Sequence, residues 1–263
     1  MKRRVLLILL CVVFLTIAGV SGVRLYRQWQ EYQTGEASYE ALTQYVHVEE
    51  TLPTEPTAAT PEPTETSADI PEPEADPTVW PEVDFEALQA VNPDVVAWIY
   101  MEGTSINYPV VQGTDNSYYL NHLFDGTYNN AGCIFMDYRN ERDLSGRNTV
   151  FYGHRMQSKA MFAPIAEYQN QSFYDEHPVC LVMTPNGNYK LEFFAGYVTD
   201  LNSQAWKLEF ESDEEYAQWL EEAMAKSTFR SPVQPTAQDR VVTFSTCTYE
   251  YNDARYVLVG VLK

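Results

Sequence analysis

The chain has 263 residues, of which 45% are hydrophobic and 21% charged, so it can fold around at least one sizeable core. Its formal net charge of -20 argues against nucleic acid as a partner, because contacts to phosphates need clustered Lys and Arg. The four cysteines form no CxxC pair, which disfavours a zinc ribbon or a scaffold held by disulfides.

Residues 1–27 predict a cytoplasmic tip and a transmembrane anchor. Basic residues at positions 2–4 precede an uncharged run from Val5 to Val23, which as a helix would be roughly 28 Å long, close to the hydrocarbon thickness of a bilayer. The basic cluster predicts a cytoplasmic N-terminus. The alternative is a cleaved signal peptide, but the run is long for a signal and lacks an A-x-A site. We expect a single-pass protein of the cell membrane whose remainder is extracellular.

Residues 28–80 predict a stalk rich in Pro, Thr and Glu. No Lys or Arg occurs between Gln28 and Tyr138, and prolines alternate with acidic residues from Thr51 to Trp80. Such a segment buries too little apolar surface to offset the entropy of ordering, and its charges repel one another. We expect a passive extended spacer, with a short helical continuation of the anchor at its start.

Residues 81–263 predict one mostly β domain. A helix is expected over 84–91, ended by Asn92-Pro93, and a second helix begins at Ser212, where Ser212 and Glu215 form a capping box. Short apolar or alternating runs separated by turn signals predict the strands, which together indicate a barrel. These runs are Val95–Tyr100, Ile106–Gln112, Cys133–Asp137, Thr149–Tyr152, Val179–Met183, Tyr189–Thr199, Arg240–Phe244 and Tyr256–Leu262.

Three residues at strand ends could carry out acyl-transfer chemistry. Cys247 ends an apolar strand, Arg255 opens the next strand after one hairpin turn, and His154 follows a third strand directly after Gly153. Together they would supply a nucleophile, a proton-transfer group and an oxyanion donor. From spacing alone, an ordinary core thiol and a surface arginine remain open as alternatives.

Several motifs in one order resemble the sortases, and class B sortases in particular. TFSTC is followed by an Arg that opens the final strand and is preceded by a strand ending in Gly-His; Phe244 stands where the family pattern has Leu. The segments NPDVVAWIYMEGTSINYPVVQGTDNSYYLNH, GCIFMDYRN and NTVFYGH, and a helix from Ser212 to about Lys226, are also similar to class B members. The resemblance runs from about residue 83 to the C-terminus.

The resemblance implies a closed β-barrel of about eight strands that acts as a cysteine transpeptidase in a Gram-positive bacterium. Such enzymes cleave secreted surface proteins at a Thr carbonyl in a C-terminal sorting signal, form a thioacyl intermediate, and pass the protein to an amine of a peptidoglycan precursor. By this resemblance, Cys247 is the nucleophile, His154 transfers protons, and Arg255 stabilises the oxyanion with help from a backbone N–H near Thr248. The chemistry needs no metal or organic cofactor.

The resemblance also implies a groove for the sorting signal. Matching the INYPV segment and the residue two before the cysteine gives Asn107, Val111 and Ser245 as contacts. Leu201 and Trp206, in the stretch before the inserted helix, would form the opposite wall. Ordinary strand packing is the alternative for each. Phe244 in place of Leu would narrow or reshape the pocket, which leaves the sorting motif open.

Other readings of the sequence fit less well. A papain-like wall hydrolase places Cys before His, the reverse of the order here, and a second transpeptidase type needs a Ser-x-Gly-Cys motif that this chain lacks. A tethered cysteine peptidase, or a peptide-binding domain without turnover, remains an alternative that activity would decide. His122 and His177 are expected to be structural, and Cys133 and Cys180 to be core thiols.

Overall fold

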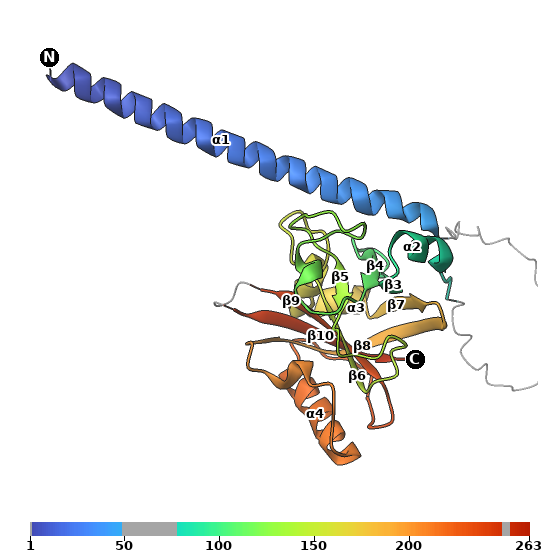
Figure 1. Cartoon of the computed structure of the whole chain (residues 1–263). Helices are drawn as coiled ribbons and strands as arrows, with labels where there is room; N and C mark the ends of the chain where they lie inside the picture. The colour runs from blue at the N-terminus through green and yellow to red at the C-terminus, as the bar shows by residue number, and fades with distance from the viewer. Residues whose placement is uncertain (1, 49–77, 249–252) are drawn as a thin grey trace, which may run out of the picture.

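The computed structural model describes residues 2–48, 78–248 and 253–263. A long N-terminal helix, α1 (Lys2–Leu42), lies against a barrel that carries a helix on its outer face (Figure 1). The barrel strands are β3 (Val95–Tyr100), β4 (Asn107–Val111), β5 (Ile134–Met136), β6 (Asn148–Tyr152), β7 (Val179–Thr184), β8 (Gly187–Thr199), β9 (Val241–Cys247) and β10 (Arg255–Leu262). The other elements are β1 (Val46–His47), β2 (Glu82–Val83), α2 (Phe85–Val91), α3 (Gln171–Glu176), α4 (Asp213–Lys226) and four 3-10 turns, at Thr43–Tyr45, Tyr118–Leu120, Ala163–Gln169 and Gln204–Trp206.

Among the described residues, eight strands close the barrel in the order β10-β8-β7-β3-β4-β5-β6-β9. The pairs β4–β5 and β6–β9 are parallel and the other pairs are antiparallel. The predicted closed barrel is therefore confirmed. Its strands agree with the predicted runs to within a few residues, and β9 continues past Phe244 as far as Cys247.

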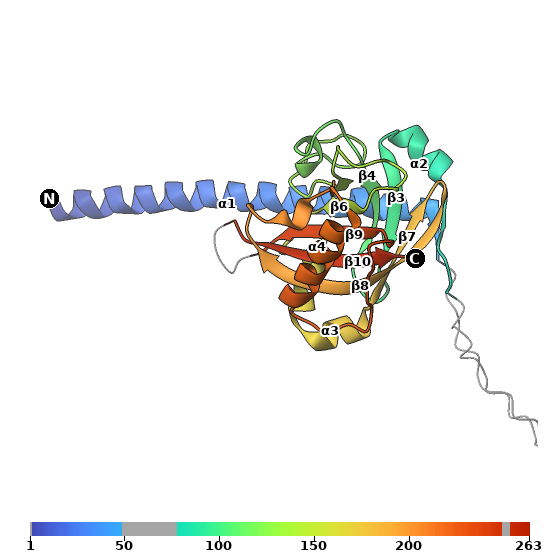
Figure 2. The same ribbon diagram turned by 90° about the horizontal axis from the view of Figure 1, so that it is seen from below.

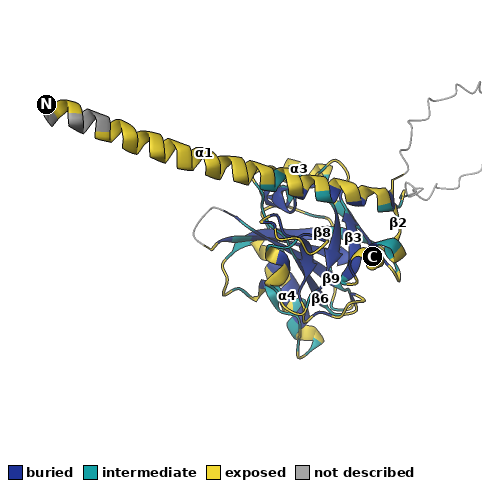
Figure 3. Ribbon diagram, turned by 45° about the horizontal axis from the view of Figure 1, so that its top comes forward, coloured by how far each residue is buried: buried dark blue, intermediate teal, exposed yellow. Residues whose placement is uncertain are grey.

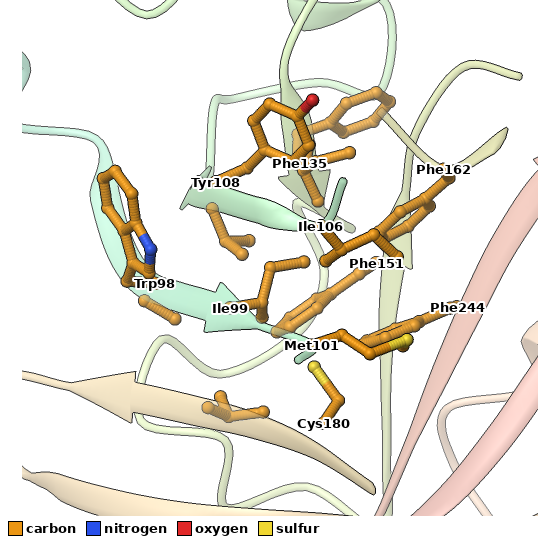
Figure 4. Close-up of a cluster of buried hydrophobic side chains, with 14 of the residues drawn as sticks. Trp98, Ile99, Met101, Ile106, Tyr108, Phe135, Phe151, Phe162, Cys180 and Phe244 are labelled. Atoms are coloured by element: carbon orange, nitrogen blue, oxygen red, sulfur yellow. The ribbon is translucent and has the colours of Figure 1, made fainter. Parts of the chain in front are cut away.

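Aromatic rings fill the interior of the barrel. The ring of Phe244 lies 5.0 Å from that of Phe162 and 5.8 Å from those of Phe151 and Phe193, and all four side chains are buried. Figure 4 shows Phe151, Phe162 and Phe244 gathered with Ile99 and Met101 from the opposite side of the core. The Phe244 side chain points into this core. Phe in place of Leu at this position therefore alters the interior packing, and the ring is not part of the pocket that Cys247 lines.

Helix α4 covers the outer face of the late strands, as predicted for the inserted helix. Ser212 caps it, since its Oγ accepts a hydrogen bond from the Glu215 N–H at 3.2 Å. The helix buries one face, formed by Tyr216, Trp219, Leu220 and Ala223, in a second apolar cluster with residues of β8 and β10. Strand β10 is therefore buried on both sides, which explains its almost continuous apolar sequence.

The last part of α1 packs onto the barrel, which differs from the predicted stalk. Gly35, Tyr39, Leu42 and Val46 are buried, and their spacing of four, three and four residues places them on one side of the chain. The Tyr39 hydroxyl donates a hydrogen bond to the Gly132 carbonyl. Figure 3 shows α1 lying across the barrel with its earlier turns exposed. The segment from Glu31 to Val48 thus packs with the folded domain.

The two ends of the Pro/Thr/Glu-rich segment meet on the barrel. Val46 pairs with Val83 and His47 with Glu82 in the antiparallel pair β1–β2, and the Asp84 N–H donates to the Tyr45 carbonyl at 2.9 Å. Residues 49–77, the middle part of the stalk predicted over residues 28–80, lie outside the described residues. Because the chain leaves and returns at the same place, their length does not set the distance between the apolar part of α1 and the barrel.

Replacing residues 49–77 by a short Gly/Ser turn should therefore leave the fold intact. Closing a shorter loop costs less entropy, so the free energy of unfolding should rise by on the order of 1–2 kcal/mol. Thermal unfolding of the full chain in detergent, followed by circular dichroism, would measure the change. A midpoint many degrees below that of the parent would show that the segment contributes packing of its own.

Candidate active site

The pairing of β9 with β10 brings Cys247 and Arg255 together. Cys247 ends β9, Arg255 begins β10, and the two are direct partners in the antiparallel register. Side chains of directly opposed residues lie on the same face of a sheet, with Cβ atoms roughly 4.5–5.5 Å apart. Cys247 is half-buried, and Arg255 Nη1 donates to the Ala254 carbonyl at 3.0 Å. The thiol and the guanidinium therefore share one face at one end of the barrel.

The parallel pairing of β6 with β9 places His154 at the same end. Tyr152 pairs with Ser245, and the Gly153 N–H donates to the Ser245 carbonyl at 3.2 Å. A Cβ at Gly153 would lie 2.5 Å from Ile134 and 2.7 Å from Phe162, so only glycine allows this close packing just before the histidine. Cys247, Arg255 and His154 consequently line one pocket of about 430 Å³.

The His154 ring is held by a backbone carbonyl. Its Nε2 lies 2.6 Å from the Leu120 oxygen. A carbonyl oxygen can only accept, so Nε2 carries the proton in this contact and Nδ1 is left for proton exchange. The 3-10 turn that ends at Leu120 thus fixes the orientation of the imidazole.

Six residues were predicted to contact the substrate, the five of the groove and Thr248, and three of them line the same pocket. Leu201, Trp206 and Ser245 surround it together with the catalytic candidates. The indole N–H of Trp206 donates to the Ser245 hydroxyl at 3.1 Å, which joins the loop after β8 to strand β9. This cross-link fixes the position of the large Trp206 ring, while the Leu201 side chain is exposed.

The other three predicted contacts lie outside the pocket-lining set. Asn107 accepts a hydrogen bond from the Trp98 indole at 2.7 Å and faces a separate cavity beside α1, and Val111 is fully buried in the core. The Thr248 N–H donates to the Ala254 carbonyl at 3.1 Å, and its hydroxyl accepts from Arg155 at 3.2 Å. The Thr248 N–H itself is thus engaged within the hairpin, and an oxyanion donor from a backbone N–H near Thr248 stays a prediction.

Seven pocket residues were not among the predicted site residues. They are Asn116, Leu120, Phe135, Arg139, Tyr152, Gly153 and Thr246. Asn116 and Leu120 come from the segment after β4, in place of Asn107 and Val111 on β4 itself. The sequence does contain a signal for Arg139, because this basic residue lies two positions after Asp137, the acidic residue that ends a predicted strand.

The side chains expected to be structural, His122, His177, Cys133 and Cys180, all pack against other parts of the fold. The His122 ring stacks on Tyr118 with centroids 4.0 Å apart, and His177 packs beside Phe173 and Gly103. Cys133 and Cys180 are buried, as predicted. Burial raises the pKa of the Cys133 thiol to about 12, which disfavours its thiolate at neutral pH.

Comparison with known proteins places this site in a family. The sortase domain family matches residues 99–263. Sortase B of Staphylococcus aureus is 40% identical over 179 residues, covering 68% of this chain and 73% of the relative. Sortase B of Listeria monocytogenes is 36% identical over 177 residues, covering 66% and 72%.

Solved structures agree with this assignment. A crystal structure of S. aureus sortase B has a TM-score of 0.65 and 39% identity, covering 68% of this chain and 86% of that one. A structure of the S. aureus sortase B-substrate complex has a TM-score of 0.66 at 39% identity, covering 68% and 84%. Clostridium perfringens sortase B has a TM-score of 0.65 at 33% identity, covering 68% and 100%. The chain belongs to the sortase family as a member of the sortase B group, which are cysteine transpeptidases.

Proposed function

We propose that this transpeptidase is anchored in the cell membrane, cleaves a C-terminal sorting signal at a Thr carbonyl, and transfers the protein to an amine of peptidoglycan. The observation that carries the proposal is the register of β9 and β10, which puts Cys247 opposite Arg255 in the pocket that His154 also lines. A solved complex of S. aureus sortase B with substrate supports a sorting signal as the ligand of this pocket.

In the proposed mechanism, the Cys247 sulfur attacks the Thr carbonyl carbon and the negative charge on the oxygen is stabilised by Arg255. The bond to the next residue breaks, and the leaving amine takes a proton from His154. An amine of peptidoglycan then attacks the thioester and gives its proton to His154, and Cys247 leaves as the thiolate. Nδ1 of His154 is the exchanging nitrogen, because the Leu120 carbonyl holds Nε2.

Incubation of the full chain in detergent with a panel of sorting peptides should give a covalent adduct. Intact mass spectrometry should show a gain equal to the N-terminal part of the peptide, absent in Cys247→Ala and retained in the control Cys11→Ala. No adduct with any peptide, on a folded and reduced protein, would favour a binding domain without turnover. An adduct that only hydrolyses, even with acceptor amines present, would favour a tethered peptidase.

Arg255→Lys tests the role of the guanidinium. Lysine keeps the charge but loses the planar fork of donors, so we expect kcat to fall by about 10²–10³-fold with a smaller change in KM. Steady-state cleavage of the peptide identified above, with circular dichroism to check folding, provides the measurement. Near-normal turnover in Arg255→Lys would contradict oxyanion stabilisation by a fork of donors.

The direction of α1 supports a catalytic end that faces the membrane. The C-terminal end of α1 lies at the end of the barrel opposite the pocket, close to where Val46 pairs with Val83. Its earlier residue Glu31 contacts Asn129 and Asn130, in the loop that leads from the Leu120 turn. Figures 1 and 2 both show the N-terminal turns of α1 extending on the side where β9 ends and β10 begins.

In the proposed arrangement, the spacing along α1 sets the distance between the bilayer and the barrel. By length and composition α1 could cross a membrane. From Val23, the last residue of the apolar run, to Glu31 the rise along a helix is roughly 12 Å. In the proposed arrangement the pocket thus opens toward the bilayer surface, where a substrate held by its own apolar segment would present its cleavage site.

Detaching α1 should therefore affect membrane-held substrates selectively. In liposomes carrying the full chain, Tyr39→Ala should lower kcat/KM about tenfold for a peptide anchored in the same bilayer, since the favourable effective concentration is lost. For a soluble peptide, kcat/KM of Tyr39→Ala should stay within about twofold of the parent value. The control Gln33→Ala, on the exposed face of the helix, should leave kcat/KM unchanged for both peptides. Equal losses on both peptides would contradict an orienting role for α1.

A further inference from the structure

One polar wall of the pocket is held by a single buried carboxylate. Asp137 directly follows β5 and its side chain is fully buried. It accepts hydrogen bonds from Asn116 Nδ2 at 2.9 Å, from Arg139 Nε at 2.9 Å and Nη2 at 2.7 Å, and from the Tyr152 hydroxyl at 3.0 Å. Both carboxylate oxygens are used, and Oδ1 also accepts a hydrogen bond from the Arg139 backbone N–H at 3.0 Å.

The three donors reach Asp137 from separate parts of the chain. Asn116 lies in the loop after β4, Arg139 in the loop after β5, and Tyr152 at the end of β6. All three line the pocket that holds Cys247, whereas Asp137 is not among the lining residues. The carboxylate therefore fixes, from behind, side chains that the pocket presents to a ligand.

The charges keep this arrangement in one protonation state. Burial favours a higher pKa for the Asp137 carboxyl, but the hydrogen bonds from Arg139, Asn116 and Tyr152 outweigh it, and the pKa lies below its usual value. Burial and the nearby carboxylate raise the pKa of Tyr152, so its hydroxyl keeps its proton and remains a donor. Near neutral pH, Asp137 is therefore ionised, and Arg139, Asn116 and Tyr152 all remain hydrogen-bond donors to it.

We propose that Asp137 is a positioning residue for peptide binding, and that it acts through Asn116, Arg139 and Tyr152; this rests on the proposed function of the pocket. Its carboxylate orients an amide, a guanidinium and an aromatic ring that together suit the carbonyl groups and polar side chains of an extended peptide. Arg139 is the outermost of the three, with half of its side chain exposed. It is the member of the wall with most freedom to contact the ligand.

The test separates peptide binding from chemistry. Asp137→Asn keeps the shape of the side chain but removes its charge, so KM should rise about tenfold or more while kcat changes by less than about threefold. The Kd of the same peptide for Cys247→Ala, measured by calorimetry, should rise by the same factor when Asp137→Asn is added. Asp239→Asn is the matched control, because Asp239 holds Lys263 and Thr236 at the far end of β10.

Arg139→Lys provides a second variant that a half-exposed position should tolerate without unfolding. It loses the two-point contact to Asp137, so KM should rise severalfold, and the double variant with Asp137→Asn should show less than the product of the two effects. A folded Asp137→Asn or Arg139→Lys protein with parental KM and Kd would overturn the proposal, as would a fall in kcat with KM unchanged. If the parent chain cleaves no peptide while its Cys247→Ala form binds one, the proposed transpeptidation fails and the role of Asp137 is still decided by Kd.

Discussion

The site depends on one structural constraint, the register in which β10 pairs with both of its neighbours. Arg255 faces Cys247 on β9 and Thr199 on β8, so the first residue of the last strand fixes three strand ends at once. A slip of one residue would turn the guanidinium to the opposite face. Packing of α4 over β8 and β10 opposes such a slip, because every residue of β10 after Arg255 is buried.

The barrel adds the histidine through a contact between residues distant in sequence. Strand β6 joins β9 in parallel, and the aromatic core around Phe244 supports that pair from inside. The imidazole is then oriented by the carbonyl of Leu120, which belongs to a loop anchored to α1 through Asn129. Helix α1 and the loop that orients the imidazole are therefore parts of one packed unit.

Local patterns predicted the elements, and the resemblance predicted the catalytic candidates. Alternation and turn residues located the strands, and the capping box located α4. Groove residues were harder, because Asn107 lies on a predicted strand and Asn116 in the polar segment after it, and only the closed barrel shows which one reaches the pocket. The docking of α1 was missed although Gly35, Tyr39, Leu42 and Val46 have helical spacing. Four positions with this spacing, followed by a proline-rich segment, do not by themselves predict that a helix packs on a domain, because the surface that they contact is formed only by the folded barrel.

The two arginines of the pocket differ in what they contact, and this difference suits them to different tasks. Arg139 donates to a buried carboxylate, which cancels most of its charge and fixes its direction. Within the described residues, Arg255 donates to a backbone carbonyl, which leaves its net positive charge beside the thiol. A developing oxyanion needs that uncancelled charge, whereas recognition of an uncharged peptide backbone needs donors of fixed direction. A chain with a net charge of -20 can therefore present a positive charge at one point, because the nearby guanidinium of Arg255 outweighs the distant, screened charges of the surface.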